Sequence, residues 1–455
     1  MATNIEKLII SHNKDAQNRK MVAFYDRKST MEKMGIARSE TAHSAFLANL
    51  LKSDNGLGLE ESAIMWLLHI LIEREDNATA YNSTSSKSPI PTDVKAAVLS
   101  QTLKYDIEEI TTEKVIDDVA HSYFATQSQY NNKRCDDRLD IYIKLKVNGL
   151  SVKYLEIVIE NKVLQDENGQ KSKNGFGYNS LTQTQRYYTA CSYNKSSDTA
   201  QLFVFLTPDE VEEETKAKDK HFIQISYQDV LDTIIIPQLD NNMLTSNERQ
   251  ELENYVDALN LPTLDIQAKK RIVMAMTEEA RIDRQTYLKK NKELIINVIK
   301  AKEKEASNSS SLTQEEQILV SFADKRKNLF AAHGMDFDTF DKSKKYFVFI
   351  TDGATYRIAH LCTADVAVNF AKLYYKYNSG PSIGQLNNDF ANVKPNIFSV
   401  CNVQKNNTNS ALYVKIANGV YFPKNIWANN YFNKLLTMID ITNNVSKDFK
   451  YEVIK

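Results

Sequence analysis

Three charged residues in the middle of the chain have the types and spacing of a site that could cleave a phosphate ester. Asp140 lies in one run of apolar residues, and Glu160 and Lys162 lie at the end of the next run. Two carboxylates held close together repel each other unless a cation lies between them, and oxygen-only ligation suits Mg²⁺ or Mn²⁺. Such an ion polarises a phosphodiester and lowers the pKa of a bound water, while a nearby lysine can orient that water or stabilise charge on the phosphate.

The segment that carries these residues has the alternation of a β-hairpin. Residues 139–145 and 155–162 place their Leu and Ile side chains on one face and the three charged residues on the other, which predicts strands with one face in a core. Asn148-Gly149 between the two runs favours a hairpin turn. Neighbouring strands would then direct the three side chains toward one place. The alternative is a half-solvated hairpin with ordinary surface charges, because these offsets also occur by chance.

The same residues resemble a known family. Asp140 followed by Glu160-Asn161-Lys162 resembles the D…E-x-K core of the PD-(D/E)XK nuclease superfamily, and the segment IVIENKV is similar to a prokaryotic branch of it. Leu139 stands where the superfamily name has Pro. The resemblance implies a metal-dependent nuclease with a restriction-endonuclease-like fold.

Two further motifs extend the resemblance. Residues 183–188 resemble the Q-x-x-x-Y element of the following helix, and residues 40–44 resemble an N-terminal E-x-x-H-S helix. The four motifs occur in the order of the family and cover about residues 38–235. The polar insert at residues 166–179 is longer than a tight link needs; it is either a loop that closes over a nucleic-acid backbone or a disordered insert.

The resemblance also implies roles for individual residues. Asp140 and Glu160, with the carbonyl of Asn161, would bind Mg²⁺ or Mn²⁺, and Glu40 would support that metal site. Glu40 has an alternative role as a capping acid in the first turn of a helix that begins near Ser39.

The remaining candidate residues would act on the substrate side. By the resemblance, Lys162 would position the attacking water, and Gln183 and Tyr187, which share a helix face, would brace the substrate or Lys162. His43 could neighbour a phosphate, although a lone histidine on a helix is more often structural.

The resemblance implies hydrolysis of nucleic acid, with DNA the expected substrate, in the restriction or antiviral systems of prokaryotes. The competing hypothesis is a nucleic-acid-binding or interaction scaffold whose chemistry is weak or lost and whose C-terminal domain carries the function. The intact triad of Asp140, Glu160 and Lys162 argues against lost chemistry. Whether a protein partner or a second copy of the chain is needed stays open.

Composition bounds these hypotheses. The chain has 455 residues, 42% hydrophobic and 25% charged, with a net charge of −1, so a DNA-binding face would have to be local. Its four cysteines are far apart and form no C-x-x-C pair, which favours reduced thiols in a cytoplasmic protein over a zinc site. We expect no signal peptide and no membrane span, because no long apolar run occurs.

The surrounding segments predict an α/β core. Residues 202–206 suit a buried central strand, and residues 222–225 suit a further strand beside a helix. We also expect residues 108–119 to be helical or mixed and residues 122–129 to form the first strand. The result would be a mixed β-sheet flanked by helices.

The chain is expected to divide into three parts. Residues 1–240 would form the nuclease-like domain, residues 241–311 a helical connector and linker, and residues 312–455 a smaller α+β domain for target or partner recognition. A long helix is expected at residues 268–304. Its second part, residues 281–304, carries eight Lys or Arg against three Asp or Glu, and is either a DNA-facing stripe or a solvated face.

Overall fold

The structure is a computed structural model whose chain forms two compact units. The first, which we call the sheet unit, comprises residues 28–263 and 273–278, and the second, the terminal unit, comprises residues 1–27, 264–272 and 279–455. The described residues are 3–54, 56–57, 62–78, 80, 88–126, 135–163, 181–193, 195–208, 217–240, 244–265, 270–307, 311–338, 344–400, 403–406, 409–446 and 448–454.

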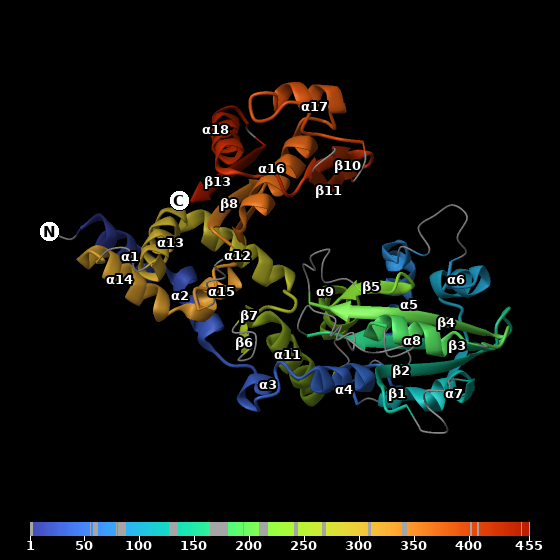
Figure 1. Cartoon of the computed structure of the whole chain (residues 1–455). Coiled ribbons are helices and arrows are strands. Elements are labelled where there is room, and N and C mark those ends of the chain that lie inside the picture. The colour runs from blue at the N-terminus through green and yellow to red at the C-terminus, as the bar shows by residue number, and fades with distance from the viewer. Residues whose placement is uncertain are drawn as a thin grey trace. The chain divides into compact units, whose positions relative to one another are not determined.

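The sheet unit is built on a five-stranded sheet with the order β1-β2-β3-β4-β5 (Figure 1). The strands are β1 (Tyr105–Val115), β2 (Arg138–Val147), β3 (Tyr154–Asn161), β4 (Thr199–Thr207) and β5 (Phe222–Ser226). β1, β2 and β3 pair antiparallel, whereas β3, β4 and β5 pair parallel. The turn between β2 and β3 contains Gly149 at φ +77°, which a glycine adopts without strain, as the Asn148-Gly149 pair predicts.

Helices cover both faces of this sheet. They are α3 (Thr30–Lys33), α4 (Glu40–Leu50), α5 (Ser62–Arg74), α6 (Thr92–Leu99), α7 (Ile116–Thr126), α8 (Gln183–Cys191), α9 (Tyr227–Val230), α10 (Ile236–Leu239) and α11 (Ser246–Asn260), with short turns η1 (Glu75–Asn77) and η4 (Leu231–Ile235). α7 and α8 pack on the face that carries Tyr142 and Val158, and α4 contacts β1 and β2 from the other. This confirms the predicted α/β core.

The burial of the strands corrects one expectation. The hairpin of β2 and β3 was expected to have one face in the core, yet Tyr142 and Val158 on the opposite face are also buried. The reason is that α7 and α8 cover this face, so the charged end of the hairpin lies at the border of a core that is apolar on both sides.

One further prediction was wrong, and one strand was not foreseen. Residues 122–129 were expected to form the first strand, but residues up to Thr126 belong to helix α7, whose buried residues follow helical spacing; residues 127–129 lie outside the described residues. The edge strand β1 occupies residues that were expected to be helical or mixed. A shift in its register between Ile107 and Glu109 interrupts the alternation that would have identified it.

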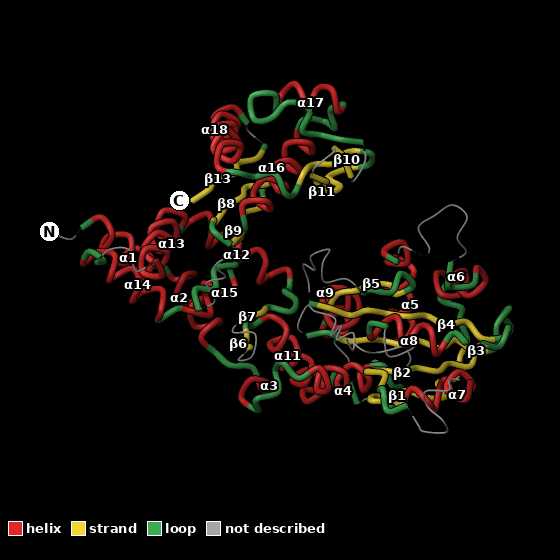
Figure 2. Tube along the Cα trace, viewed as in Figure 1, coloured by secondary structure: helices red, strands yellow, loops and turns green. Residues whose placement is uncertain are grey.

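The terminal unit combines a helical part and an α+β part (Figure 2). Its helices are α1 (Asn4–Lys14), α2 (Ala16–Asp26), α12 (Glu278–Lys290), α13 (Lys292–Ser307), α14 (Gln314–Asp324), α15 (Lys327–Ala332), α16 (Thr363–Tyr377), α17 (Ile383–Asp389) and α18 (Asn429–Val445). Its strands are β8 (Tyr346–Asp352), β9 (Thr355–Leu361), β10 (Val403–Asn406), β11 (Asn409–Ala417), β12 (Val420–Pro423) and β13 (Phe449–Ile454), besides the short pair β6 (Thr263–Asp265) and β7 (Lys270–Ile272).

Residues 1–27 belong to the terminal unit by their contacts, because α1 packs on α13 and α14, and α2 packs on α15. The sequence analysis placed these residues with the nuclease-like domain. The expected domain limits at residues 240 and 311 stay predictions. In the α+β part, the sequence predicts hairpins at residues 346–358 and 412–422 and a helix at residues 363–377. The structure has these elements as the pair β8 and β9, the pair β11 and β12, and helix α16.

The expected long helix is three elements. Residues 270–272 form β7, and α12 and α13 meet at Asn291. The Asn291 amide donates to the carbonyl of Tyr287 at 3.0 Å and exchanges hydrogen bonds with the buried amide of Asn18 at 3.1 Å. These side-chain hydrogen bonds mark the junction between α12 and α13 and tie it to α2.

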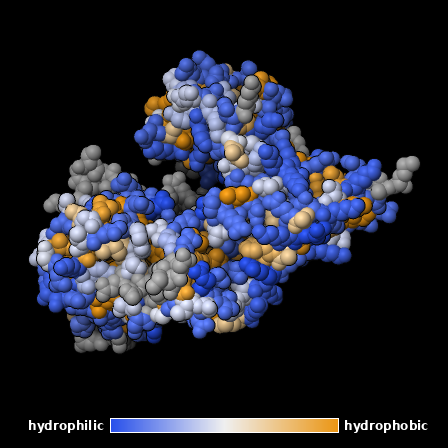
Figure 3. Space-filling view, turned by 180° about the vertical axis from the view of Figure 1, so that it is seen from behind, coloured by the Kyte–Doolittle hydropathy of each residue, from blue (hydrophilic) through white to orange (hydrophobic). Residues whose placement is uncertain are grey.

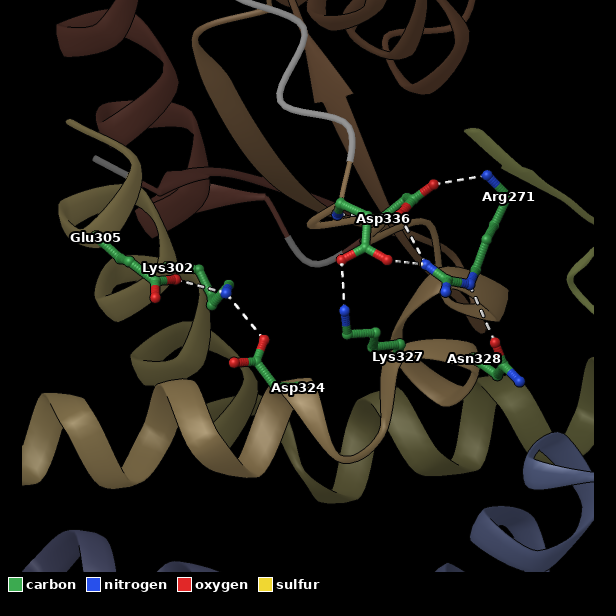
Figure 4. A network of polar contacts seen from close by, with 8 residues as sticks. Arg271, Lys302, Glu305, Asp324, Lys327, Asn328 and Asp336 are labelled. Atoms are coloured by element: carbon green, nitrogen blue, oxygen red, sulfur yellow. Dashed lines mark hydrogen bonds and ion pairs between the residues drawn. The ribbon is translucent and has the colours of Figure 1, made fainter. Parts of the chain in front are cut away.

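At least half of the basic side chains at residues 281–304 have an acidic partner among the described residues. Lys302 lies between Glu305 and Asp324, at 2.5 and 3.0 Å (Figure 4), and Lys304 forms an ion pair with Glu316 at 2.7 Å. Figure 4 also shows Arg271 on β7, which is held by Asp336 and Asn328. These contacts favour the solvated, ion-paired interpretation of the stretch over a DNA-facing stripe.

The surface shown in Figure 3 and the described cysteines carry no further functional signal. On the face shown in Figure 3, hydrophilic side chains predominate and apolar ones are scattered between them. Within the described ranges, no helix has the length and apolar character needed to cross a membrane. Cys135, Cys191 and Cys362 are free thiols, and Cys401 lies outside the described residues.

Candidate active site

Strand pairing brings Asp140 and Glu160 together at one end of the sheet. Ile141 of β2 pairs with Ile159 of β3, so the next positions toward this end are Asp140 and Glu160. In an antiparallel pair, residues directly opposite each other point to the same face. The two carboxylates therefore lie side by side on the face that α7 and α8 cover.

Glu160 is a fully buried carboxylate. Its side chain is 0% exposed, and its Oε1 contacts the ammonium of Lys162. Burial and then the charge of Asp140 raise its pKa well above the ordinary value, and the charge of Lys162 opposes this. Apart from this ion pair, the carboxylate has no partner among the described residues, so its buried charge is only partly compensated.

Lys162 follows β3 and supplies the nearest counter-charge. Its ammonium forms an ion pair with Glu160 and lies 3.4 Å from Glu40 Oε2. Burial alone would lower the pKa of Lys162, but the carboxylates of Glu160 and Glu40 outweigh it and raise that pKa above its ordinary value. The side chain therefore stays protonated.

Glu40 reaches this group from helix α4. The Ser39 hydroxyl caps the helix by accepting from the Ala42 amide at 3.1 Å, which places Glu40 in the first turn. A carboxylate there is favoured by the helix dipole, which supports the structural role weighed for Glu40; its support of a metal site stays a prediction. Its side chain is 31% exposed and is the solvent-facing acid of the group.

Asp140 is partly buried and is fixed by the backbone of β3. Its Oδ2 accepts a hydrogen bond from the Asn161 amide at 2.7 Å. Burial raises the pKa of Asp140 to about 6, against the opposing effects of Lys162 and that hydrogen bond. The charges of Glu40 and Glu113 raise the pKa further.

Glu113 is an acidic neighbour that sequence reasoning missed. Thr112 pairs with Ile141 and Lys114 with Leu139, so Glu113 lies across from Asp140 on β1. It adopts φ +55°, which is uncommon for a residue with a side chain and costs energy. No sequence signal marked it, because β1 itself was not predicted.

Asn161 points its side chain away from the carboxylates. Its amide nitrogen donates to the Ser44 hydroxyl at 3.0 Å and to the Glu40 carbonyl at 3.3 Å. Its amide oxygen accepts from the Tyr227 hydroxyl at 2.7 Å. Asn161 therefore connects β3 with α4 and α9, and only its main chain can take part in the site. Its predicted role through the carbonyl stays a prediction.

Gln183 and Tyr187 brace the strand that carries Asp140. The Gln183 amide donates to the Tyr187 hydroxyl at 2.9 Å, and that hydroxyl donates to the carbonyl of Arg138 at 2.5 Å. Burial, followed by the charge of Glu160, raises the pKa of Tyr187, so the phenol remains a donor. Among the described contacts neither residue bonds Lys162, and their catalytic role stays a prediction.

His43 is a structural residue. It is fully buried, with Nε2 at 3.1 Å from the Ala37 carbonyl and Nδ1 at 3.1 Å from the Tyr255 hydroxyl. Because a carbonyl can only accept, Nε2 carries the proton. Burial lowers the pKa of His43 to about 4, so the ring is neutral, and both nitrogens are used away from the charged group.

The loop expected beside the site cannot be assigned. Residues 165–180, which include Lys171 and Lys173, lie outside the described residues, as does Arg134. The sequence predicts that Lys171, Lys173 and Arg134 contact phosphate, and this stays a prediction.

The donor set fits a hard divalent cation. Within the described part of the chain, no group of three or more His, Cys, Asp or Glu side chains is gathered to hold a metal ion. Mg²⁺, however, keeps several waters and commonly uses only one or two carboxylates. Asp140 and Glu160 offer these, and a cation beside them would replace Lys162 as the counter-charge of the buried Glu160.

Comparison with known proteins identifies one relationship. The family model described as the PD-(D/E)XK nuclease superfamily matches residues 30–324, which is more than half of the chain. The matched range includes all four motifs noted in the sequence. No curated protein and no solved structure matches the chain.

Proposed function

The chain belongs to the PD-(D/E)XK nuclease superfamily, and from this premise we propose that it is a deoxyribonuclease that depends on Mg²⁺ or Mn²⁺. The nuclease class follows from the family, whose members typically use divalent metal ions. The observation that supports the proposal best is the placement of Asp140 and Glu160 on adjacent strands with Lys162 beside them.

The residues of the site would divide the chemistry between them. Asp140 and Glu160, with the carbonyl of Asn161, would hold the divalent ion, which when bound polarises the phosphodiester and activates a water. Lys162 stays protonated, so it would orient that water or stabilise charge on the phosphate and would not remove a proton. Glu40, on the solvent side of Lys162, would hold that ammonium in place.

Hydrolysis would leave a 5′-phosphate, as the resemblance to the family implies. DNA is the proposed substrate, and a second copy of the chain or another protein is a proposed requirement for activity. The competing hypothesis is a catalytically weak scaffold, for which the ion pair of Lys162 with Glu160 is the supporting observation, because that pair satisfies the carboxylate without a metal.

Cleavage of DNA tests the proposal directly. Plasmid and linear single- and double-stranded DNA would be incubated with Mg²⁺ or Mn²⁺ and the wild type, Asp140→Ala or Lys162→Ala. We expect metal-dependent cleavage by the wild type and none by the variants. Lys144→Met is a matched control, because Lys144 lies on β2 in the same sheet and pairs with Glu108 at 3.2 Å, away from the site.

Each other outcome has a definite meaning. Cleavage that survives both site variants would place the activity elsewhere and overturn the proposed site. An absence of cleavage together with Mn²⁺ binding that depends on Asp140 would indicate a nuclease that requires a partner. An absence of both cleavage and Mn²⁺ binding would favour the scaffold.

For the biological setting, we propose DNA restriction or antiviral defence in a prokaryote, which rests on the resemblance alone. Phage plating on cells that express the wild type or Lys162→Ala measures it. Equal plating efficiency on both strains would remove this role while leaving the nuclease proposal intact.

A further inference from the structure

The side chain of Asn161 has its hydrogen-bonding groups engaged inside the protein. It is 0% exposed, its two amide hydrogens point to the Ser44 hydroxyl and the Glu40 carbonyl, and its oxygen accepts from Tyr227. Ser44 and Tyr227 are themselves buried. A buried amide satisfied in this way has a single orientation, since rotation by 180° would set its oxygen against the Glu40 carbonyl.

These contacts join the parts of the proposed active site. The main-chain amide of Asn161 holds Asp140, and its side chain holds the first turns of α4, where Glu40 and Ser44 lie one turn apart. Asn161 thus helps to set the distance between Glu40 and the carboxylates of the sheet, together with the ion pair of Glu40 and Lys162. The Tyr227 hydroxyl is one of the three partners that orient the Asn161 amide.

We propose that Tyr227 is a positioning residue of the active site: its hydroxyl fixes the amide of Asn161, and Asn161 in turn fixes Glu40 and Asp140 relative to each other. The inference rests on the proposed function, because the geometry that Tyr227 maintains is that of the proposed metal and phosphate site. Ser44 is the second positioning residue, at the other end of the same amide.

The chemistry of the tyrosine suits this role. Tyr227 is fully buried, and burial raises the pKa of its phenol well above the ordinary value, so it remains a hydrogen-bond donor at every working pH. The Tyr227 ring also contacts the His43 ring edge-on, with centroids 5.6 Å apart. Phenylalanine would keep this packing and remove only the hydrogen bond, leaving the Asn161 oxygen buried and unsatisfied.

A matched pair of variants separates positioning from stability. Tyr227→Phe removes the hydroxyl that bonds Asn161, whereas Tyr255→Phe removes an equally buried hydroxyl that bonds His43 in the same core. In the full chain, Mn²⁺ affinity would be measured by electron paramagnetic resonance, kcat and KM on DNA by initial rates, and stability by urea unfolding. Groups that orient the ligands of a metal typically contribute 10–100-fold to metal affinity or activity.

We expect Tyr227→Phe to weaken Mn²⁺ binding and to lower kcat by about tenfold or more, with KM nearly unchanged. We expect Tyr255→Phe to lose a similar amount of stability while its Mn²⁺ affinity and kcat stay near those of the wild type. Ser44→Ala should act in the same direction as Tyr227→Phe, and it serves as the test if the tyrosine variant does not fold.

Two different results would overturn the inference: one leaves the proposed function intact, and the other does not. If the wild type binds Mn²⁺ and cleaves DNA but Tyr227→Phe and Ser44→Ala match Tyr255→Phe, the positioning role is wrong while the nuclease stands. If the wild type neither binds Mn²⁺ nor cleaves DNA, the proposed function itself fails, and the inference fails with it.

Discussion

At the scale of single residues, the site concentrates negative charge where the protein is least able to solvate it. Glu160 is fully buried, and Asp140 beside it has a pKa of about 6 because of burial and neighbouring acids. Groups whose pKa values are shifted in this way cluster at functional sites, where stability is given up for chemistry. Removing one of these acids should therefore change the free energy of unfolding as well as the activity.

Asp140→Asn should stabilise the metal-free protein above pH 6. The unfolded chain releases the Asp140 proton near its ordinary pKa of 3.8 and the native chain only near 6, so the native state holds the extra proton between these values and loses stability as pH rises through them. The variant avoids this loss, by on the order of 1–3 kcal/mol at pH 8. Urea unfolding with EDTA at pH 8 and pH 4 measures it.

The free energies of unfolding of the wild type and Asp140→Asn should be similar at pH 4. Mn²⁺ should raise the Tm of the wild type but not of Asp140→Asn. A variant that is less stable than the wild type at pH 8 would show that the hydrogen bond from the Asn161 amide outweighs the cost of the buried charge.

The charged residues of the site could be predicted from sequence because their motifs are local and their order is fixed. Glu160, Asn161 and Lys162 are consecutive, and the strand alternation of β2 places Asp140 beside them. Tyr227 could not be found in this way. It is one of 23 tyrosines, and only the packing of α9 against the sheet brings its hydroxyl to Asn161.

At the scale of elements, predictions succeeded for the apolar strands, including the edge strand β5, and failed for the acidic edge strand β1. The continuous apolar run of β4 identifies a strand buried on both faces. The edge strand β1 is rich in glutamate, mostly half-buried and interrupted by a register shift. Its pairing with β2 determines its structure, and this tertiary contact overrides its local preference.

The helix α13 gives a second prediction. Lys302 and Lys304 are engaged with acids of their own unit, so they should not contribute to DNA binding. Each phosphate contact adds about 0.9 to the slope of log Kobs against log salt concentration for double-stranded DNA. We expect the slope of Lys302→Gln/Lys304→Gln to equal that of the wild type in filter-binding or anisotropy titrations with Asp140→Ala as the common background.

A decrease of the slope by about two would mean that both lysines contact phosphates. That result would restore the alternative in which residues 281–304 form a DNA-facing stripe, with the ion pairs opening when DNA binds.

At the scale of the whole molecule, the chain crosses between its two units several times. The terminal unit draws on residues 1–27, 264–272 and 279–455, and the sheet unit on the segments between them. Domains predicted from sequence are continuous segments, so residues 1–27 were expected in the same domain as the residues that follow them. The apolar face of an amphipathic helix indicates that the helix packs against another element but does not identify that element. The structure identifies it, because α1 packs on α13 and α14 and α2 packs on α15.

Tyr25→Ala should therefore damage the terminal unit and spare the active site. Tyr25 is 2% exposed in α2, and its ring meets those of Phe24 and His333 at 4.9 and 5.9 Å. Truncating a buried aromatic side chain costs about 3–5 kcal/mol. We expect a lower unfolding temperature for the terminal unit by calorimetry, with unchanged Mn²⁺ affinity; a loss of Mn²⁺ affinity would show that the two units depend on each other.

The division of the chain also sets an order for its biosynthesis. Every segment of the sheet unit has been translated once residue 278 has left the ribosome, whereas α1 and α2, translated earlier, have to wait for residues 279–455. During that interval the apolar side chains of Ile5, Met21 and Tyr25, buried in the finished protein, lack the native partners that residues 279–455 supply. Helices α1 and α2 precede the sheet unit in the chain but are thus completed after it, and nascent chains halted well beyond residue 278 should already contain a folded sheet unit while α1 and α2 are still accessible to chaperones.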